Sequence, residues 1–135
     1  MNKNNENLIL DYAVSVPLVV EELSIEGIKH FVEISSNIKS SELGMIVKGK
    51  EFVLPNWAEE LNEKAKSTKE IVYLIISDID ELNFLEQDKF YSILKYSGIN
   101  AFKFPENVRI ILTAKKGGFA KLSKRIQSLC MVIRA

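Results

Sequence analysis

The sequence is poor in cysteine and histidine. Its 135 residues include one cysteine, Cys130, and one histidine, His30. One cysteine excludes an internal disulfide and favours a reducing compartment, so we expect a cytoplasmic protein with a buried, inert thiol. His30 has no second imidazole with which to share a metal ion, and we expect it to be a packed or surface side chain. We therefore expect no metal site and no cofactor.

Long apolar runs are also missing. No run approaches the ~20 residues that a membrane helix needs, and the polar start MNKNNENLIL lacks the features of a signal peptide. We expect residues 1–7 to be disordered and the protein to make no contact with a membrane. Apolar residues make up 47% of the chain and charged residues 27%, which is typical of a globular protein. Residues 1–135 are therefore expected to form one domain.

Net charge is absent as well, but the two signs are unevenly distributed. Residues 1–102 carry ten basic and 17 acidic side chains, whereas residues 103–135 carry eight basic side chains and one acidic side chain. The basic end includes a patch of four lysines, Lys115, Lys116, Lys121 and Lys124. Such a segment can face phosphates, face the acidic part of a neighbouring copy, or form a solvated rim.

The apolar pattern predicts strands that alternate with helices. We expect strands at residues 13–20, with Pro17 marking an edge or an irregular start, and at 71–76, 108–114 and 130–133. Helices are expected after Ser24, over a face that includes Ile28 and Val32, and after Pro55, where Asn56 would be the cap. Further helices are expected around residues 90–96 and 122–126, and a hairpin at 45–53 that turns at Lys48-Gly49-Lys50. This alternation indicates a three-layer α/β/α fold with a mainly parallel sheet.

A polar cluster follows the most apolar strand. Ile71–Ile76 is apolar on both faces, as a central strand requires, and Ser77-Asp78-Ile79-Asp80-Glu81 comes next. Ligands of parallel sheets collect at the carboxyl ends of the strands. Asp78 and Asp80 could hold a divalent cation there, or Asp80 could cap the following helix while Asp78 is a solvated turn residue.

Three segments give the chain a resemblance to the AAA+ ATPases, particularly the MoxR-like and McrB-like branch. LPNWAEELNEKAKSTKEIVYLIISDIDELNFLEQDKFYSIL is similar to the helix, Walker B strand and following helix of that family. PENVRIILTAKKG is similar to the sensor-1 strand, and LSKRIQSLCMVI is similar to the segment that carries the arginine finger. The resemblance covers residues 15–135 and implies a P-loop NTPase-like fold without the C-terminal helical lid.

The phosphate-binding loop of that family has no counterpart here. Its GxxxxGKS/T motif holds phosphates through backbone N–H groups and a lysine. The equivalent stretch contains Gly27, but Ile28 stands at the lysine position and Lys29 at the hydroxyl position. Nearby glutamates, Glu21 and Glu22 among them, would repel a triphosphate.

The other nucleotide-handling positions are altered as well. In one alignment Ser77 replaces the metal-binding aspartate and Asp78 the catalytic glutamate, and in the other Asp78 binds the metal while Ile79 replaces the glutamate. Lys115 stands where the sensor-1 asparagine is usual. Arg125 alone falls at a retained position, that of the arginine finger, although it could equally be a surface arginine.

Taken together, the resemblance and its departures imply a catalytically inactive AAA+-like module that interacts with proteins. Its partner would be a second copy or an active ATPase. One alternative is nucleic-acid binding through the basic C-terminal third, and another is weak nucleotide binding. We expect no hydrolysis of ATP or GTP.

Overall fold

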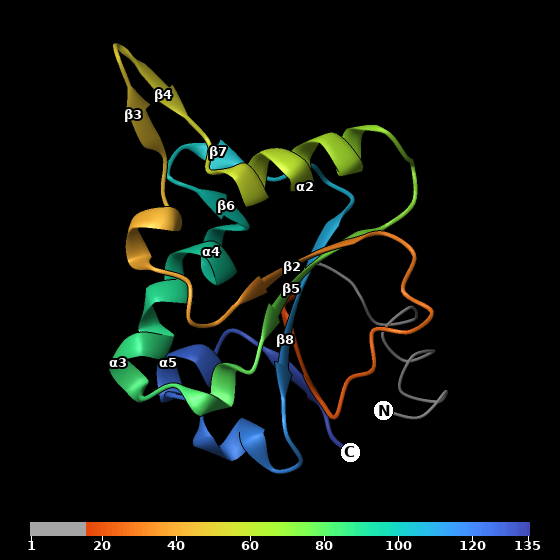
Figure 1. Cartoon of the computed structure of the whole chain (residues 1–135). Helices are drawn as coiled ribbons and strands as arrows, with labels where there is room; N and C mark the ends of the chain where they lie inside the picture. Colours follow the sequence, from red (N-terminus) through yellow and green to blue (C-terminus); the bar gives the residue numbers. More distant parts are fainter. Residues whose placement is uncertain (1–15) are drawn as a thin grey trace.

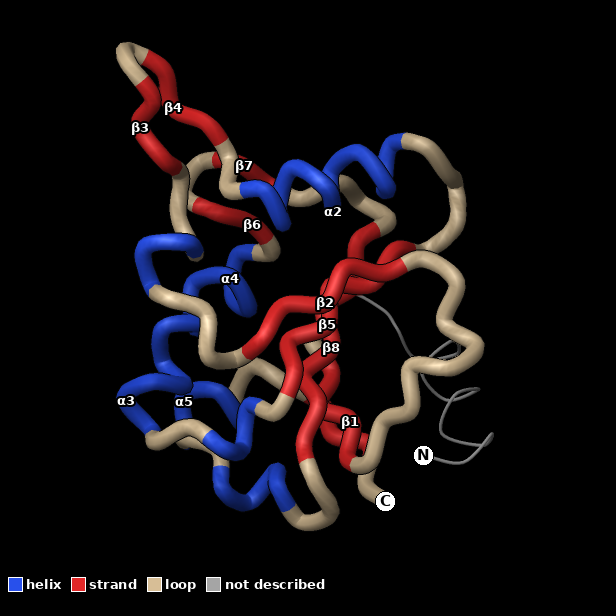
Figure 2. Tube along the Cα trace, viewed as in Figure 1, coloured by secondary structure: helices blue, strands red, loops and turns tan. Residues whose placement is uncertain are grey.

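The computed structural model describes residues 16–135, and a five-stranded sheet forms its centre (Figures 1 and 2). All of its neighbouring strands pair in parallel. In spatial order the strands are β2 (Phe31–Ser35), β5 (Val72–Ser77), β8 (Val108–Ala114), β1 (Leu18–Glu21) and β9 (Met131–Ile133). The expected α/β class with a mainly parallel sheet is confirmed. The expectations for residues 1–7, and for Ala13 to Ser15 of the first strand, lie outside the described residues.

Both faces of the sheet are buried, which explains the apolar character of its central strands. In β5, Leu74 and Ile76 face the larger core cluster, while Tyr73 and Ile75 face the smaller one. β5 lies between β2 and β8, so it is an interior strand, as the sequence predicts. β1 is interior too, and Pro17 immediately precedes it, where its carbonyl accepts the N–H of Met131 at 3.0 Å. Pro17 therefore marks the start of a strand and not an edge of the sheet.

The helices of the described part lie on one side of the sheet, as Figure 1 shows. They pack over the larger core cluster, and the irregular segment 22–30 covers the smaller cluster with Leu23 and Ile28. The molecule thus has three layers: helices, sheet and this segment. The α-helices are α2 (Asn56–Lys66), α3 (Phe84–Gln87), α4 (Tyr91–Tyr96) and α5 (Lys124–Gln127).

The prediction of a helix after Ser24 is wrong. Ser24 caps only a local turn, Gly27 adopts a left-handed φ of 88°, and Phe31–Ser35 is a strand. Val32 and Ile34 pack into the larger core cluster while Glu33 between them is exposed, so the period of this segment is two and not 3.6.

Distance explains the missing helix. The nine residues between β1 and β2 must cross β8 and β5, which takes three strand spacings or about 14 Å. They must also return along the length of a strand, because β2 is parallel to the rest of the sheet. A helix of that length would span only ~13 Å, whereas the same residues reach about 30 Å when extended. The connection is therefore extended and irregular.

Two hairpins complete the fold. β3 (Ile46–Lys48) and β4 (Glu51–Val53) turn through Gly49, with Lys48 opposite Glu51, as the sequence predicts. This hairpin projects from the body of the molecule (Figure 1). The second hairpin is β6 (Gly98–Ile99) with β7 (Phe102–Lys103).

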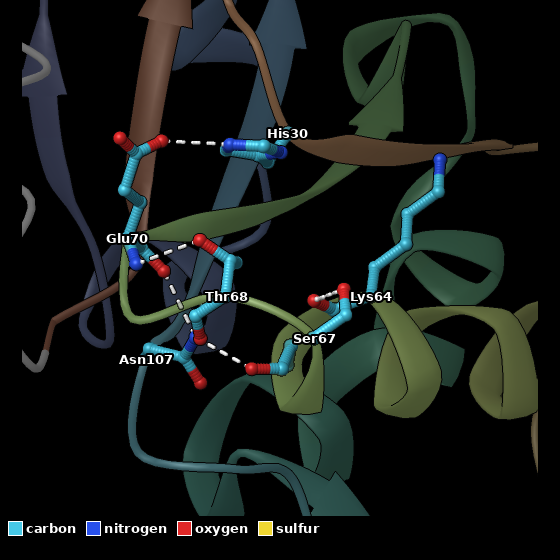
Figure 3. A network of polar contacts seen from close by, with 7 residues as sticks. His30, Lys64, Ser67, Thr68, Glu70 and Asn107 are labelled. Atoms are coloured by element: carbon cyan, nitrogen blue, oxygen red, sulfur yellow. Dashed lines mark hydrogen bonds and ion pairs between the residues drawn. The ribbon is translucent and has the colours of Figure 1, made fainter.

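A polar network fixes the amino-terminal end of β5 (Figure 3). The side-chain amide of Asn107 donates to the carbonyls of Ala65, Thr68 and Glu70 at 2.9, 3.2 and 2.9 Å. These bonds tie the end of α2 to the start of β5. His30 lies at the surface beside Glu70, with Nε2 and Oε2 2.7 Å apart. At the other end of α2 the cap is Pro55, without a side-chain hydrogen bond, and the expectation that Asn56 is the cap is wrong.

The order of the strands distinguishes this sheet from those of other parallel α/β folds. The first strand of the sheet lies between the fourth and the fifth, unlike the flavodoxin-like and Rossmann orders. This arrangement is compatible with a P-loop NTPase-like fold. Within the described residues, no helix is long and apolar enough to cross a bilayer.

Candidate functional site

The carboxyl ends of β1, β2, β5 and β8 bring polar side chains together at one edge of the sheet. β1 ends in Glu21, β5 in Ser77, and the segment after β8 contains a turn with Gly117 and Gly118. This is where ligands of parallel sheets bind. We call this region the carboxyl edge.

Glu21 is the most buried charged side chain of the carboxyl edge, with only 2% of its surface exposed. Its Oε2 accepts the backbone N–H of Phe119 at 3.1 Å, and its Oε1 accepts that of Ala135 at 3.4 Å. Next to it, Oε1 of Glu22 accepts the N–H of Lys116 at 3.2 Å. Backbone N–H groups of this kind are what an anion-binding concavity offers. Here these N–H groups donate to the carboxylates of Glu21 and Glu22.

The pKa of Glu21 reflects this arrangement. Burial alone would raise it, but N–H groups of Gly117, Phe119 and Ala135, together with the charge of Arg134, lower the pKa below its ordinary value of 4.5. Glu21 is therefore a buried carboxylate that keeps its charge at neutral pH.

The stretch aligned with the phosphate-binding loop has no phosphate-binding geometry. Gly27 lies in a turn, Ile28 packs against the smaller core cluster, and Lys29 is exposed. No helix begins after β1, so the helix N-terminus that holds phosphates in such loops is missing from residues 22–30.

Ser77 and Asp78 lie at the carboxyl edge as the sequence predicts, but their contacts are structural. The Ser77 hydroxyl donates to Oε2 of Glu33 at 2.6 Å. Asp78 adopts a left-handed conformation with φ 59°, and its N–H donates to the Thr113 hydroxyl at 2.9 Å. Its carbonyl accepts the Ser36 hydroxyl at 3.1 Å. The backbone of Asp78 thus joins three neighbouring strands, while its side chain is exposed.

Asp80 does not cap the following helix. That cap is Asn83, whose side chain accepts the N–H of Glu86 at 2.9 Å. One oxygen of Asp80 accepts the N–H of Lys115 at 3.2 Å, and the other is buried without a partner. Gly118 packs directly against this carboxylate, because a Cβ at Gly118 would lie 2.6 Å from Oδ2 of Asp80.

The described residues contain no group of three or more His, Cys, Asp or Glu side chains arranged to hold a metal ion. Asp78 and Asp80 belong to separate contacts, and the amide of Lys115 already occupies one oxygen of Asp80. One oxygen of Asp80 and the carboxylates of Glu21 and Glu22 thus accept backbone N–H groups of the chain itself.

Arg125 is engaged within its own chain. Its guanidinium carbon lies 4.0 Å from the centre of the Tyr91 ring, and Nη1 lies 3.7 Å from Oδ2 of Asp88. Both partners are on the helical side of the sheet, on Tyr91–Tyr96 and just before it.

The lysines of the predicted basic patch are exposed, but acidic side chains lie among them. Lys115, Lys116, Lys121 and Lys124 all lie between the end of β8 and the first turn of α5. Nζ of Lys115 is 3.6 Å from Glu81, and the backbone of Lys116 is bound by Glu22. Two ion pairs, Lys115–Glu81 and Arg125–Asp88, thus join a cation of residues 103–135 to an acid of residues 1–102 in the same molecule.

Sequence reasoning missed the roles of Glu21, Thr113 and Gly118. One feature of the sequence could have identified Glu21 as a site residue. It is the charged last residue of a strand that is otherwise wholly apolar, Leu18-Val19-Val20. Thr113 and Gly118 gave no signal, because their partners lie more than 30 positions away in the sequence.

Comparisons with known proteins support the fold alone. No family model and no curated protein matches the chain. A crystal structure of NtrX from Brucella abortus is similar, with a TM-score of 0.52 and 16% sequence identity. The similarity covers 98% of this chain and 36% of that chain, so this chain spans about a third of the NtrX structure.

Proposed function

We propose that this chain is a catalytically inactive AAA+-like module that interacts with proteins, docking on itself or on an active ATPase. The sequence resemblance and the compatible strand order support the scaffold. The contacts at the carboxyl edge support the loss of catalysis.

One observation carries the proposal. At the carboxyl end of β1, the carboxylate of Glu21 accepts the backbone N–H groups of Phe119 and Ala135. A phosphate at this position would find the N–H groups of Phe119 and Ala135 already bound to that carboxylate. It would also meet a group of the same charge in a place shielded from water, where repulsion between charges is strong.

Two further features agree with an inactive site. The segment after β1 supplies no helix N-terminus and no lysine at the expected position. Ser77, at the metal-binding position of one alignment, donates its hydroxyl to Glu33.

The test is a measurement of nucleotide hydrolysis and binding on the purified chain. We expect no Mg²⁺-dependent turnover of ATP or GTP above that of a mock preparation, and no heat of nucleotide binding in calorimetry. Turnover that an Asp78→Ala substitution abolishes would refute the proposal. Saturable nucleotide binding without turnover would favour the weak nucleotide-binding alternative.

Nucleic-acid binding is the second candidate, because four exposed lysines lie in one segment. It requires binding that falls steeply with salt and that disappears when Lys115, Lys116, Lys121 and Lys124 are changed to Glu. If the protein is monomeric and binds nucleic acid tightly in gel shifts at ~100 mM salt, nucleic-acid binding becomes the better-supported function and the interaction-module proposal is refuted.

A further inference from the structure

Two pairs of large apolar side chains are exposed at separate places on the molecule. Val47 and Phe52, on the β3–β4 hairpin, are 63% and 72% exposed, and Phe84 and Leu85, on α3, are 60% and 82% exposed. Single exposed apolar residues are ordinary, whereas contiguous exposed apolar patches with a polar rim mark interaction sites.

Neither pair serves the fold. None of the four side chains belongs to a core cluster or packs against one. The hairpin strands pair only with each other, and the register places Val47 opposite Phe52, so both side chains lie on one face. On α3, Phe84 and Leu85 are the first two residues after the Asn83 cap, and both side chains are exposed.

The surroundings of the two pairs have opposite charge. The hairpin turn carries Lys48 and Lys50 with Glu51, whereas residues 78–88 carry five acidic side chains and no basic one. Glu81 and Glu86 have cationic neighbours in Lys115 and Lys89, but about half of each glutamate side chain remains exposed, 52% and 55%. A basic apolar tip and an acidic apolar surface thus occur on the same molecule.

The hairpin does not reach the α3 surface of its own chain. Figures 1 and 2 show it extending from one end of the molecule, with α3 near the other end. A contact between the two surfaces must therefore involve two molecules.

We propose that the β3–β4 hairpin of one copy docks on α3 of a second copy. Val47 and Phe52 lie against Phe84 and Leu85, and the hairpin lysines face Glu81 and Glu86. The contact joins different surfaces, so each copy offers one free hairpin and one free α3, and association continues to a ring or a filament. This inference deepens the proposed function by naming the surface through which the module docks on itself.

Complementation between two variants tests the proposal. One variant carries Val47→Ser and Phe52→Ser, and the other carries Phe84→Ser and Leu85→Ser. We expect the unmodified chain to associate as its concentration rises, and each variant alone to remain monomeric. An equimolar mixture should form 1:1 dimers that grow no further, because one intact hairpin meets one intact α3.

Light scattering and analytical ultracentrifugation measure these states. Ile25→Ser is the matched control, because Ile25 is an exposed apolar residue on the segment that covers the other face of the sheet, and this variant should associate like the unmodified chain. At concentrations where the unmodified chain is monomeric, circular dichroism and thermal unfolding should be unchanged in all variants, since the substituted side chains lie outside the core. An unmodified chain that stays monomeric up to its solubility limit overturns the proposal, as does a mixture that stays monomeric.

Cysteine crosslinking provides a second readout, because a disulfide traps a contact that is short-lived. In a Cys130→Ser background, Val47→Cys combined with Leu85→Cys should give a ladder of oxidised oligomers, and either substitution alone should give none. Strong dimers from the Val47→Cys variant without the second substitution would indicate a symmetric contact between hairpins and would overturn the proposal. These outcomes are independent of nucleotide turnover, so failure here is distinguishable from failure of the inactive-module proposal.

Discussion

Glu21 stabilises the carboxyl edge through hydrogen bonds that depend on its charge. We expect Glu21→Gln to lower the free energy of unfolding at pH 7 by about 1–3 kcal/mol, because charged acceptors form the stronger bonds. Urea unfolding monitored by Trp57 fluorescence measures this difference. Glu26→Gln, an exposed position on the segment after β1, is the matched control and should change stability little.

The effect of Glu21 also depends on pH, in a direction that its pKa fixes. The folded pKa lies below the ordinary value of 4.5, so the unfolded chain takes up this proton first as the pH falls. The contribution of Glu21 is therefore complete above that ordinary value and is lost as the pH falls through the folded pKa. The stability difference between Glu21→Gln and the unmodified chain should shrink over this range. A difference that stays constant down to the folded pKa would contradict the assignment.

Gly118 is required for a close approach and not for an unusual φ. A Cβ there would meet Asp80 at 2.6 Å and the Cβ of Ala114 at 2.8 Å. We expect Gly118→Ala to destabilise the fold by about 1–3 kcal/mol, the usual cost of overpacking. Gly44→Ala is the control, since its nearest contact would be an ordinary 3.5 Å. Equal melting temperatures of the two variants would show that Asp80 moves aside at little cost.

At the level of elements, Asn107 joins α2 to β5 through three carbonyl acceptors. Asn107→Asp removes the donors and places a carboxylate among carbonyl oxygens, so we expect a loss of about 2–4 kcal/mol, more than for Asn107→Ala. Thermal unfolding measures the loss. The same change at Asn56, which is exposed in the first turn of α2, should be neutral or slightly stabilising, because a negative charge there favours the helix. If Asn107→Asp melts like Asn56→Asp, the network of Figure 3 does not hold α2 in place.

The strands could be predicted from the sequence because their apolar residues lie next to one another in the chain. β8 spans Val108–Ala114 as predicted, and the hairpin turns at the predicted place. The segment 22–30 could not be predicted in this way, since its apolar residues match helical spacing by coincidence. Its conformation depends on the distance between β1 and β2. That distance follows from the order of the strands in the sheet, which the residues of this segment alone do not determine.

The same limit applies to the candidate site. Ser77 and Asp78 could be placed at the carboxyl edge because they directly follow the apolar run of β5. The contacts that define the edge join Glu21 to Phe119 and Asp78 to Thr113, across 98 and 35 positions. The assembled sheet determines which backbone N–H groups lie close to a given carboxylate. Such contacts therefore cannot be predicted from residues that are neighbours in the sequence.

Across the described part of the molecule, the strands differ widely in how deeply they are buried. We therefore expect their backbone amides to differ widely in protection from hydrogen exchange. Amides of the interior strands β5 and β8 should exchange only through global unfolding, whereas those of the projecting β3–β4 hairpin should exchange quickly. Hydrogen exchange followed by mass spectrometry measures both in one experiment. Protection of the hairpin should rise with protein concentration as copies dock. Hairpin amides as protected as those of β5 in dilute solution would contradict the exposure described above.

The contacts of Glu21 also restrict how this protein could change over evolutionary time. A route to phosphate binding at the carboxyl edge begins with the removal of a carboxylate that holds the turn after β8 and the backbone of Ala135 in place. That first step costs stability and brings no ligand, because the segment after β1 still lacks a helix and a suitably placed lysine. Several substitutions would have to occur together before binding offset the loss. Single substitutions that must each preserve the fold therefore keep this edge closed to phosphate.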